Sequence, residues 1–191
     1  MSSVDTLVAD LIGGDEAAAE AAVARLAERG ESAVTSVLAL LGSPESEHRW
    51  WAVRTLAAMP SPRTEWFIDA LRDPEAEVRA AAALALAAHP HGSAGPSLVR
   101  ALSDNEHLVG LLAVNASVKI GAPIVPLLLD AFDGAPQRGR IHIMRALAEV
   151  RDPRSIQLMM ACLAESSAAL QYWAQEGLER LGLNMVYMRP H

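Results

Sequence analysis

The chain has 191 residues, of which 51% are apolar and only 4% aromatic, and its formal net charge at pH 7 is −7. This apolar content with a modest net charge excludes a disordered chain. Alanine and leucine are the most frequent residue types, and because both favour helices the composition excludes an all-β fold.

Helical spacing and turn residues together predict twelve helices. Val34, Val37, Leu38 and Leu41 show the i, i+3, i+4, i+7 spacing of one helix face, and Gly or Ser/Asp-Pro signals separate such segments. Each repeating unit is therefore two helices, which we name B (inner) and A (outer). In chain order we predict B 4–12, A 15–29, B 31–42, A 44–58, B 62–72, A 74–88, B 94–103, A 105–119, B 122–133, A 136–149, B 153–165 and A 167–181.

The helices belong to an internal repeat whose period is the spacing from Leu41 to Leu71 and from Leu71 to Leu102. Five apolar columns keep this register: Ala22, Ala52, Ala82, Ala113, Ile143, Ala174; Leu26, Leu56, Leu86, Ser117, Leu147, Leu178; Leu11, Leu41, Leu71, Leu102, Phe132, Leu163; Leu7, Val37, Phe67, Leu98, Leu128, Met159; and Val8, Leu38, Ile68, Val99, Leu129, Met160. A helix pair of this length cannot bury its apolar faces alone, whereas stacked neighbours can. The repeat therefore predicts an all-α fold, an α-solenoid of about six helix hairpins in one domain over residues 1–182.

The segment 73–86, Asp-Pro-Glu-Ala-Glu-Val-Arg-Ala-Ala-Ala-Ala-Leu-Ala-Leu, resembles the A-helix signature of HEAT-like repeats, the short form also found in phycobilin lyases. The resemblance weakens near residue 105, where Gly110 interrupts an arginine column and Ser117 interrupts the leucine column. It implies a right-handed stack of helix hairpins used mostly as a scaffold for protein contacts, with B helices on the concave side. We expect the arginine column to tie repeats together through acids or helix C-terminal carbonyls; its members are Arg49, Arg79 and Arg140.

The B helices present an outward stripe with few charges and several large apolar groups, which is typical of a binding surface. We therefore predict a concave binding site, unless curvature buries much of the stripe in packing. Its residues are Trp66, Asp69, Arg100, Leu127, Asp130 and Leu158.

Two aromatic pairs occupy equivalent columns of A helices four units apart, Trp50-Trp51 and Tyr172-Trp173. One member of each pair should face outward, because a helix in a single-layer stack cannot bury nearly its whole circumference. These residues predict an outer interface for a partner or a homodimer. The alternative is that both pairs cover the ends and seams of the stack.

The C-terminal segment 183–191 is apolar and follows the last predicted helix. Because a terminal repeat has an open face, we expect Met185, Val186 and Met188 to cap the stack. The alternative is a segment that docks into another molecule.

Recognisable catalytic chemistry is absent. The six histidines form no helix-borne pair with metal-ligand spacing, and Glu47-His48 and Glu106-His107 reverse the His-Glu dipeptides of the HEAT-like deoxyhypusine hydroxylases. The single cysteine, Cys162, excludes an internal disulfide and has no basic neighbour on its predicted face that would lower its pKa. We expect it to be a buried or half-buried hydrophobe, with no metal, no cofactor and no catalytic residues in the chain.

The sequence shows no run long and apolar enough to cross a membrane and no signal peptide at Met1–Leu7. We therefore expect a cytoplasmic protein that does not contact membranes.

These features favour a non-catalytic scaffold, not an enzyme, that binds an unidentified protein partner on its concave face.

An alternative follows from the resemblance to phycobilin lyases: a tetrapyrrole (bilin) lyase-like protein or carrier, in which Arg100 and Asp69 hold a pigment carboxylate and ring nitrogens. A third interpretation rests on HEAT-like alkylpurine DNA glycosylases, which place Trp, Asp and Arg on a concave face, as Trp66, Asp69 and Arg100 would be here. The net charge of −7 opposes DNA, so no nucleic-acid partner is expected.

Overall fold

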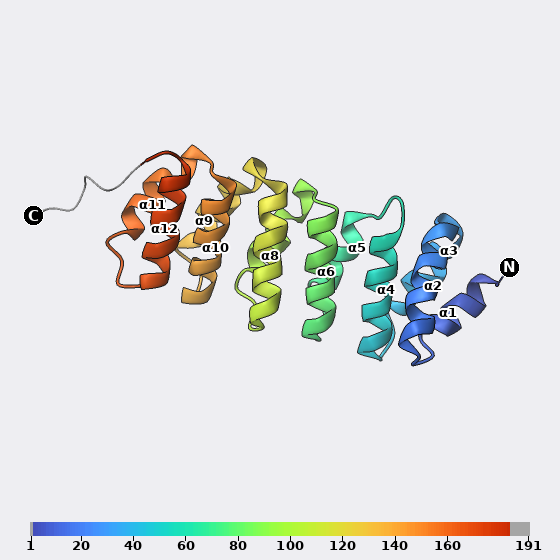
Figure 1. The fold of residues 1–191 in the computed structure, drawn as a ribbon. Coiled ribbons are helices and arrows are strands. Elements are labelled where there is room, and N and C mark those ends of the chain that lie inside the picture. The colour runs from blue at the N-terminus through green and yellow to red at the C-terminus, as the bar shows by residue number, and fades with distance from the viewer. Residues whose placement is uncertain (1, 184–191) are drawn as a thin grey trace, which may run out of the picture. The chain divides into compact units, whose positions relative to one another are not determined.

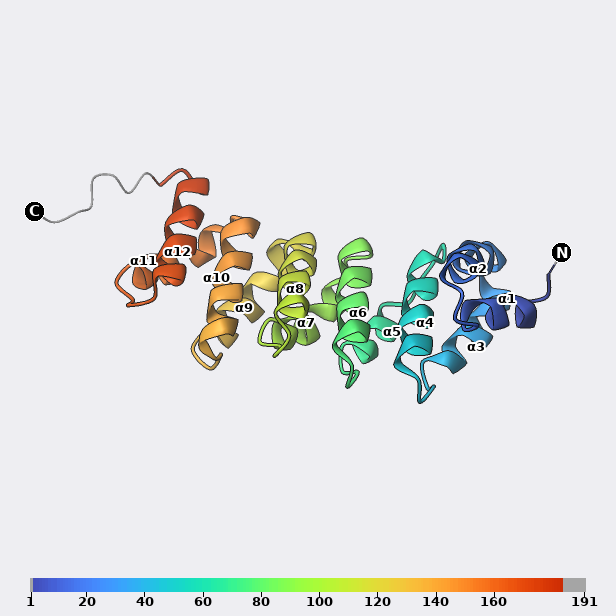
Figure 2. The same ribbon diagram turned by 60° about the horizontal axis from the view of Figure 1, so that its bottom comes forward.

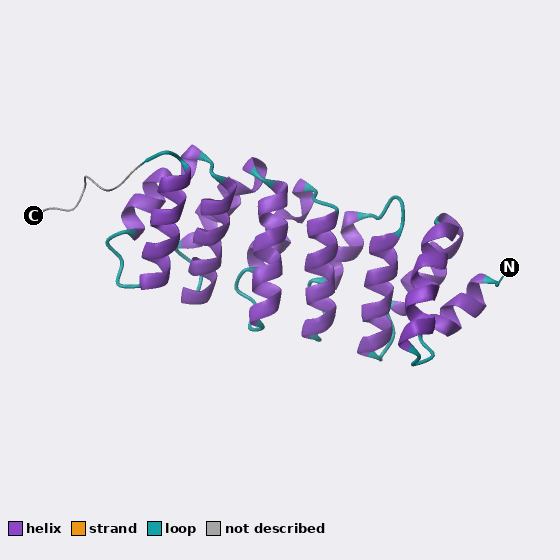
Figure 3. Ribbon diagram, in the orientation of Figure 1, coloured by secondary structure: helices purple, strands orange, loops and turns teal. Residues whose placement is uncertain are grey.

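The computed structural model describes residues 2–183, and within them it contains twelve α-helices, three short 3₁₀ helices and no strand (Figure 3). The predicted all-α fold is confirmed. The chain divides into two compact units, residues 1–89 and 90–191, which we describe separately. The predicted cap formed by Met185, Val186 and Met188 lies outside the described residues.

Unit 1 consists of three helix hairpins. They are α1 (Val4–Leu11) with α2 (Glu16–Arg29), α3 (Glu31–Leu40) with α4 (Ser46–Ala58), and α5 (Thr64–Ala70) with α6 (Ala76–Ala88). The A helices α2, α4 and α6 lie side by side, and each B helix packs against the A helix of its own hairpin (Figures 1 and 2). Gly30 joins α2 to α3 with a positive φ of 53°, a conformation that costs glycine little.

Unit 2 repeats the arrangement with α7 (Gly95–Ala101) and α8 (His107–Ile120), α9 (Val125–Phe132) and α10 (Gln137–Val150), and α11 (Ile156–Cys162) and α12 (Ala168–Arg180). A 3₁₀ turn precedes each B helix here: Gly92–Ala94, Ala122–Ile124 and Pro153–Ser155. The A helices α8, α10 and α12 again lie side by side (Figure 1).

The predicted helices correspond one to one with the observed helices, but several B helices end slightly earlier than predicted. The chain tightens there, because amides such as that of Leu41 bond the carbonyl of the third preceding position, Leu38 O at 3.1 Å. This is the 3₁₀ pattern that commonly closes an α-helix. Leu41 therefore keeps its apolar position in the repeat column, although the α-helix ends at Leu40.

The core follows the predicted columns. The columns that begin at Ala22, Leu26 and Leu7 are buried at every position, including Ser117 in the leucine column. The column that begins at Leu11 is buried except at Leu41 and Leu163, which are half-buried. The column that begins at Val8 lies at the edge of the stripe: its members are half-buried except for Met160, which is 43% exposed.

The arginine column ties neighbouring turns together, as predicted. Arg49 forms a bidentate ion pair with Asp73 of the next hairpin, at 2.7 and 2.8 Å, and donates to the carbonyls of Ser43 and Pro44. Arg140 pairs with Glu165 at 2.6 Å. The carbonyls that Arg49 binds belong to the turn between helices, so the expectation of helix C-terminal carbonyls was wrong in that detail.

Burial and hydrogen bonding have opposite effects on the pKa of the Asp73 carboxyl. Burial would raise the pKa of this carboxyl, but hydrogen bonds from Arg49 and from the Glu75 amide outweigh it, and the pKa is lowered. The ion pair is therefore retained across the neutral range.

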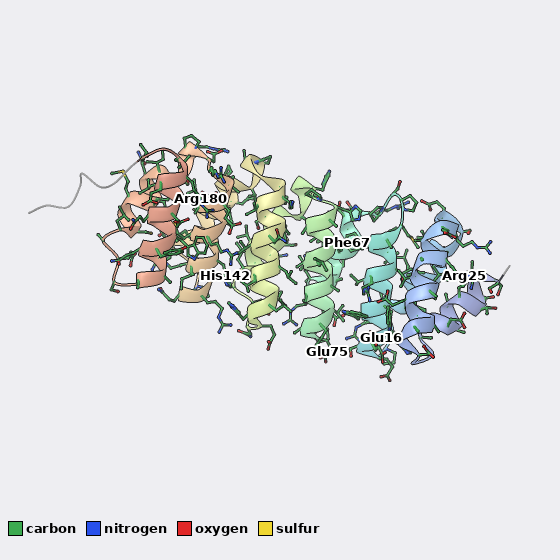
Figure 4. The ribbon with its side chains drawn as sticks, viewed as in Figure 1. Glu16, Arg25, Phe67, Glu75, His142 and Arg180 are labelled. Atoms are coloured by element: carbon green, nitrogen blue, oxygen red, sulfur yellow. The ribbon has the colours of Figure 1, made fainter. Side chains whose placement is uncertain are left out.

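At Gly110, where the arginine is missing, the following A helix supplies the replacement. Arg138 of α10 donates to the carbonyls of Asp104 and Asn105, which correspond to those that Arg49 binds in its own turn. His142 of α10 (Figure 4) is buried and its Nδ1 donates to the Leu102 carbonyl at 2.8 Å. Arg138 thus supplies the carbonyl contacts that an arginine at position 110 would make, and His142 adds a separate hydrogen bond from α10 to the end of α7.

Among the described residues, no single helix has the length and hydropathy of a membrane span. One pair of consecutive segments, His107–Ile120 and Ala122–Phe132, reaches both only when taken together, and it is bent by 112°.

Candidate functional site

The predicted binding residues lie in two adjacent columns of the B helices, and these columns differ in exposure. The first column is exposed at every position: Ala39, Asp69, Arg100, Asp130 and Ala161. The second column is half-buried except for Ser97, which is buried: Ser36, Trp66, Ser97, Leu127 and Leu158. Each large apolar side chain of the second column is thus partly packed, and the rest of its surface lies next to an exposed residue of the first column.

Unit 1 contains Trp66 and Asp69. The Arg63 guanidinium lies 5.9 Å from the centre of the Trp66 ring. Asp69 pairs loosely with Arg72 of its own turn at 3.7 Å, with both side chains mostly exposed. A contact this exposed contributes little to stability, so the Asp69 carboxylate is free to exchange partners.

Unit 2 contains the other four predicted residues. Arg100 is exposed and donates to the Ser97 hydroxyl at 2.9 Å. Leu127 of α9 packs over Gly95 of α7, where an added Cβ would lie only 2.8 Å from Leu127 Cδ1. Asp130 is exposed on α9, and Leu158 is half-buried on α11. One face of α7, α9 and α11 therefore presents a cation, an anion and two apolar groups.

The A helices hold the first aromatic pair in unit 1. Trp51 is 5% exposed, whereas Trp50 is half-buried, and the two rings meet edge to face with centres 4.7 Å apart. The Arg54 guanidinium lies 4.7 Å from the centre of Trp50 and 5.1 Å from that of Trp51. Glu20 of α2 holds Arg54 through contacts of 2.6 and 3.3 Å.

Two hollows adjoin Trp50 in unit 1. A hollow of about 330 Å³ lies between α2 and α4, and its lining is Gly14, Asp15, Glu16, Ala19, Glu47, Trp50 and Trp51. A second hollow of about 310 Å³ lies between α4 and α6, and its lining is Ser46, Glu47, Trp50 and Glu77. Trp50 and Glu47 are shared by both.

The second aromatic pair lies on α12. Tyr172 is 56% exposed, Trp173 is half-buried, and their rings meet edge to face at 5.1 Å. The Arg145 guanidinium of α10 lies 5.0 Å from the centre of Trp173 and also pairs with Glu149. Arg54 and Arg145 occupy the same repeat column, so an arginine accompanies both aromatic pairs.

The titratable groups of the described chain do not assemble into a metal centre: within residues 2–183 no three His, Cys, Asp or Glu side chains could hold a metal ion together. Cys162 is 1% exposed, as predicted. Burial raises the pKa of its thiol, and the nearby Glu165 carboxylate raises it further. A buried thiol with a raised pKa is a poor nucleophile.

Sequence reasoning missed the carboxylates around Trp50 and the two arginines over the aromatic rings. A signal for both was present. Glu47 and Glu77 stand one repeat apart, each at the second position of an A helix, and Arg54 and Arg145 recur in one column. First-turn acids are commonly explained by the helix dipole alone, which is why they attract little notice.

Helix hairpins stacked in register, with an exposed stripe along the B helices, define an α-solenoid repeat protein. Residues 64–138 match the family of HEAT repeats, and residues 140–165 match the PBS lyase HEAT-like repeat. The chain belongs to the HEAT-like repeat family, as the resemblance implied.

Several curated relatives are similar over part of the chain. The bilin biosynthesis protein RpcF of Synechococcus sp. (strain WH8020) is 34% identical over 93 residues, which is 48% of this chain and 44% of RpcF. The phycocyanobilin lyase subunit beta of Nostoc sp. is 32% identical over 56% of this chain and 54% of its own length. The uncharacterized phycocyanin operon protein Z of Pseudanabaena tenuis is 29% identical over 71% and 72%, respectively. The chain thus spans about half the length of the first two relatives.

Solved structures give a similar result. The complex of CpcE and CpcF of phycocyanin lyase from Nostoc sp. PCC7120 is 26% identical with a TM-score of 0.58, covering 75% of this chain and 96% of that chain. An engineered protein is 20% identical with a TM-score of 0.55, covering 95% and 99%. The second likeness concerns the fold alone.

These relatives correct two predictions. The interpretation of the chain as a non-catalytic scaffold, and as not an enzyme, was wrong, because the relatives are a bilin biosynthesis protein and a lyase subunit, and the structural neighbour is a lyase complex. The inference failed because it equated the absence of a recognisable catalytic motif with the absence of catalysis. A binding surface that holds and orients a reactive ligand needs no such motif.

Proposed function

We propose that the protein is a bilin lyase-like protein, which binds a linear tetrapyrrole and acts on it together with a protein partner. The observation that carries the proposal is the 32% identity to a phycocyanobilin lyase subunit over 109 residues, supported by the likeness to the CpcE–CpcF complex. That complex holds two proteins, which favours a protein partner here as well.

The B-helix face of unit 2 offers the chemistry that such a pigment requires. A linear tetrapyrrole combines an apolar conjugated system with carboxylates and ring N–H groups. In our proposal the exposed Arg100 binds a pigment carboxylate through its planar fork, and the exposed Asp130 accepts from ring nitrogens. Leu127 and Leu158 pack against the apolar system. In unit 1 the same two columns contain Trp66 and Asp69.

The chain's own part in a lyase reaction would be to bind and orient the pigment. A lyase adds a group across a double bond or removes it, and such a step gains rate when the reacting atoms are held in place. Cys162, with its buried thiol, is not suited to be the added nucleophile. The nucleophile would come from a second protein, to which the pigment would become attached.

The test is to mix the purified protein with a bilin and record visible absorbance and fluorescence. We expect a spectral change that is lost or weakened about tenfold in Arg100→Glu, since reversing one charge turns an ion pair of about 1–2 kcal/mol into repulsion. Arg25→Glu is the matched control, because Arg25 is exposed on the A helix α2 and makes the same change of charge.

Two outcomes would contradict parts of the proposal. If the wild-type protein causes no spectral change with any bilin, the lyase-like function is wrong. If Arg25→Glu weakens binding as much as Arg100→Glu does, the pigment responds to net charge and the B-helix face is not its site.

A further inference from the structure

The hollow between α4 and α6 lies on the A helices of unit 1, whereas we assign the pigment to the B helices of unit 2. Its lining combines an indole with two carboxylates, Trp50, Glu47 and Glu77, and includes no basic residue. The adjoining hollow adds Asp15 and Glu16, again without a basic residue in its lining. Both surfaces carry unneutralised negative charge next to an aromatic ring.

The helices on either side of α4 are rich in alanine. In the same repeat column as Trp50, α6 has Ala80, and the lining on the α2 side includes Ala19. A bulky indole between alanine-rich helices leaves space on both sides. Trp51 and Ala52 are buried and fix the helix beneath it, so Trp50 is held in place while part of its surface stays open.

The carboxylates of Glu16, Glu47 and Glu77 are exposed and form no ion pair with any residue of the described chain. First-turn acids stabilise a helix dipole, and that accounts for their presence on each helix separately. It does not account for their gathering around a half-exposed tryptophan, which is costly to leave in water.

Unit 1 already contains one example of what this combination binds. On the α2 side of Trp50, the Arg54 guanidinium lies 4.7 Å from the ring centre and is held by the Glu20 carboxylate at 2.6 Å. On the α6 side the same indole has Glu47 and Glu77 beside it and no guanidinium in the lining. The α6 side thus offers the same pairing of an indole with carboxylates, but its lining holds no guanidinium.

We infer that the hollows beside Trp50 bind a basic segment of a partner polypeptide, with an arginine or lysine side chain between α4 and α6. Cation–π attraction to Trp50 and charge pairing with Glu47 and Glu77 hold this side chain. The adjoining hollow takes the next cationic side chain of the segment. A second copy of this chain is disfavoured as the occupant, because each copy carries a net charge of −7.

The test titrates the protein with an octapeptide of alternating lysine and arginine, followed by calorimetry and by tryptophan fluorescence. An octapeptide of glutamine and serine is the peptide control. We expect Trp50→Ala and the double variant Glu47→Gln/Glu77→Gln each to weaken binding about tenfold, as the loss of about 1.4 kcal/mol would. Glu28→Gln/Glu65→Gln removes the same charge at exposed positions of unit 1 outside the hollows, and we expect a change of less than about twofold.

The experiment can overturn the inference in three ways. Equal weakening in the two double variants would show general attraction to an acidic protein. Unchanged binding in Trp50→Ala would remove the aromatic ring from the site. A wild-type dimer that Trp50→Ala converts to a monomer in sedimentation would assign the face to self-association.

If Trp50→Ala fails to fold, the exposed Glu47→Gln/Glu77→Gln pair decides the question by itself. No pigment enters the experiment, so its outcome is independent of the proposed bilin chemistry.

Discussion

Gly110 of α8 and His142 of α10 fit against each other so closely that no other residue could replace the glycine without displacing the ring. A Cβ at position 110 would lie 2.5 Å from Cε1 and 2.7 Å from Nδ1 of His142. The missing side chain is thus what admits the imidazole, whose Nδ1 bonds the Leu102 carbonyl. The residue that weakens the sequence repeat at this position is required by the packing of the next helix.

Gly110→Ala should therefore destabilise the protein by about 1–3 kcal/mol, because the displaced ring loses its hydrogen bond and overpacks its surroundings. In a His142→Ala background the same change should be neutral or stabilising, since alanine has the higher helix propensity. Urea unfolding of the four proteins measures this coupling. Equal effects of Gly110→Ala in both backgrounds would contradict the interlocking of the two residues.

The ion pair between Arg49 and Asp73 should be one of the strongest single polar contributions to unit 1. Its side chains are only 11% and 10% exposed, so Arg49→Ala removes both arginine hydrogen bonds from a partly buried carboxylate and leaves the Ser43 and Pro44 carbonyls without this donor. We expect a loss of about 3–5 kcal/mol in unfolding free energy. Arg72→Ala, which breaks the exposed contact with Asp69, should cost about 1 kcal/mol or less. Comparable losses would show that the buried pair contributes no more to stability than the exposed one.

The columns of Ala22, Leu26 and Leu7 could be predicted from the sequence because burial at a helix interface repeats with the helix itself. Edge positions could not: Ile68 and Met160 belong to one column, yet the first is half-buried and the second is exposed. Their burial depends on the length and direction of neighbouring side chains, which periodicity does not record.

Compensation between helices is equally hidden from a column-by-column comparison. The loss of an arginine at position 110 is visible in the sequence, but Arg138, which takes over its carbonyl contacts, and His142, which fills the space it leaves, belong to the following repeat. The candidate binding residues fall in two classes for a related reason. A helical wheel predicts that Arg100 and Asp130 are exposed, whereas the packing of Leu127 over Gly95 is a contact between two helices.

Protonation of His142 should destabilise unit 2 as the pH falls. Burial lowers the pKa of this imidazole; the hydrogen bond to Leu102 opposes that effect, and the charges of His107, Arg138 and Arg145 reinforce it. A folded-state pKa below the unfolded value of about 6.5 means that the unfolded chain takes up the proton first. The contribution of neutral His142 is therefore complete above about pH 6.5 and is lost as the pH falls through the folded-state pKa.

His142→Asn separates this effect from the titration of carboxylates, because the amide can still donate to the Leu102 carbonyl but does not titrate in this range. The difference in unfolding free energy between wild type and His142→Asn should be constant above about pH 7 and should shift against the wild type at lower pH. Urea unfolding at several pH values measures it. A difference that does not change between about pH 7.5 and pH 5 would show that His142 has the same pKa in both states.

The buried thiol of Cys162 leads to a prediction about where a pigment would become attached. With the side chain 1% exposed and its pKa raised by burial, Cys162 should react with a thiol reagent only after the protein unfolds. Any bilin that the protein binds should accordingly separate from the chain on denaturation, leaving no coloured or zinc-fluorescent band on a denaturing gel.

Cys162→Ala should leave the bilin-induced spectral change intact while costing about 1–2 kcal/mol of stability through the lost packing. A pigment that stays on the denatured wild-type chain but not on Cys162→Ala would reverse this assignment and make the thiol an acceptor. Release from both would leave the pigment to be passed to a nucleophile on another protein.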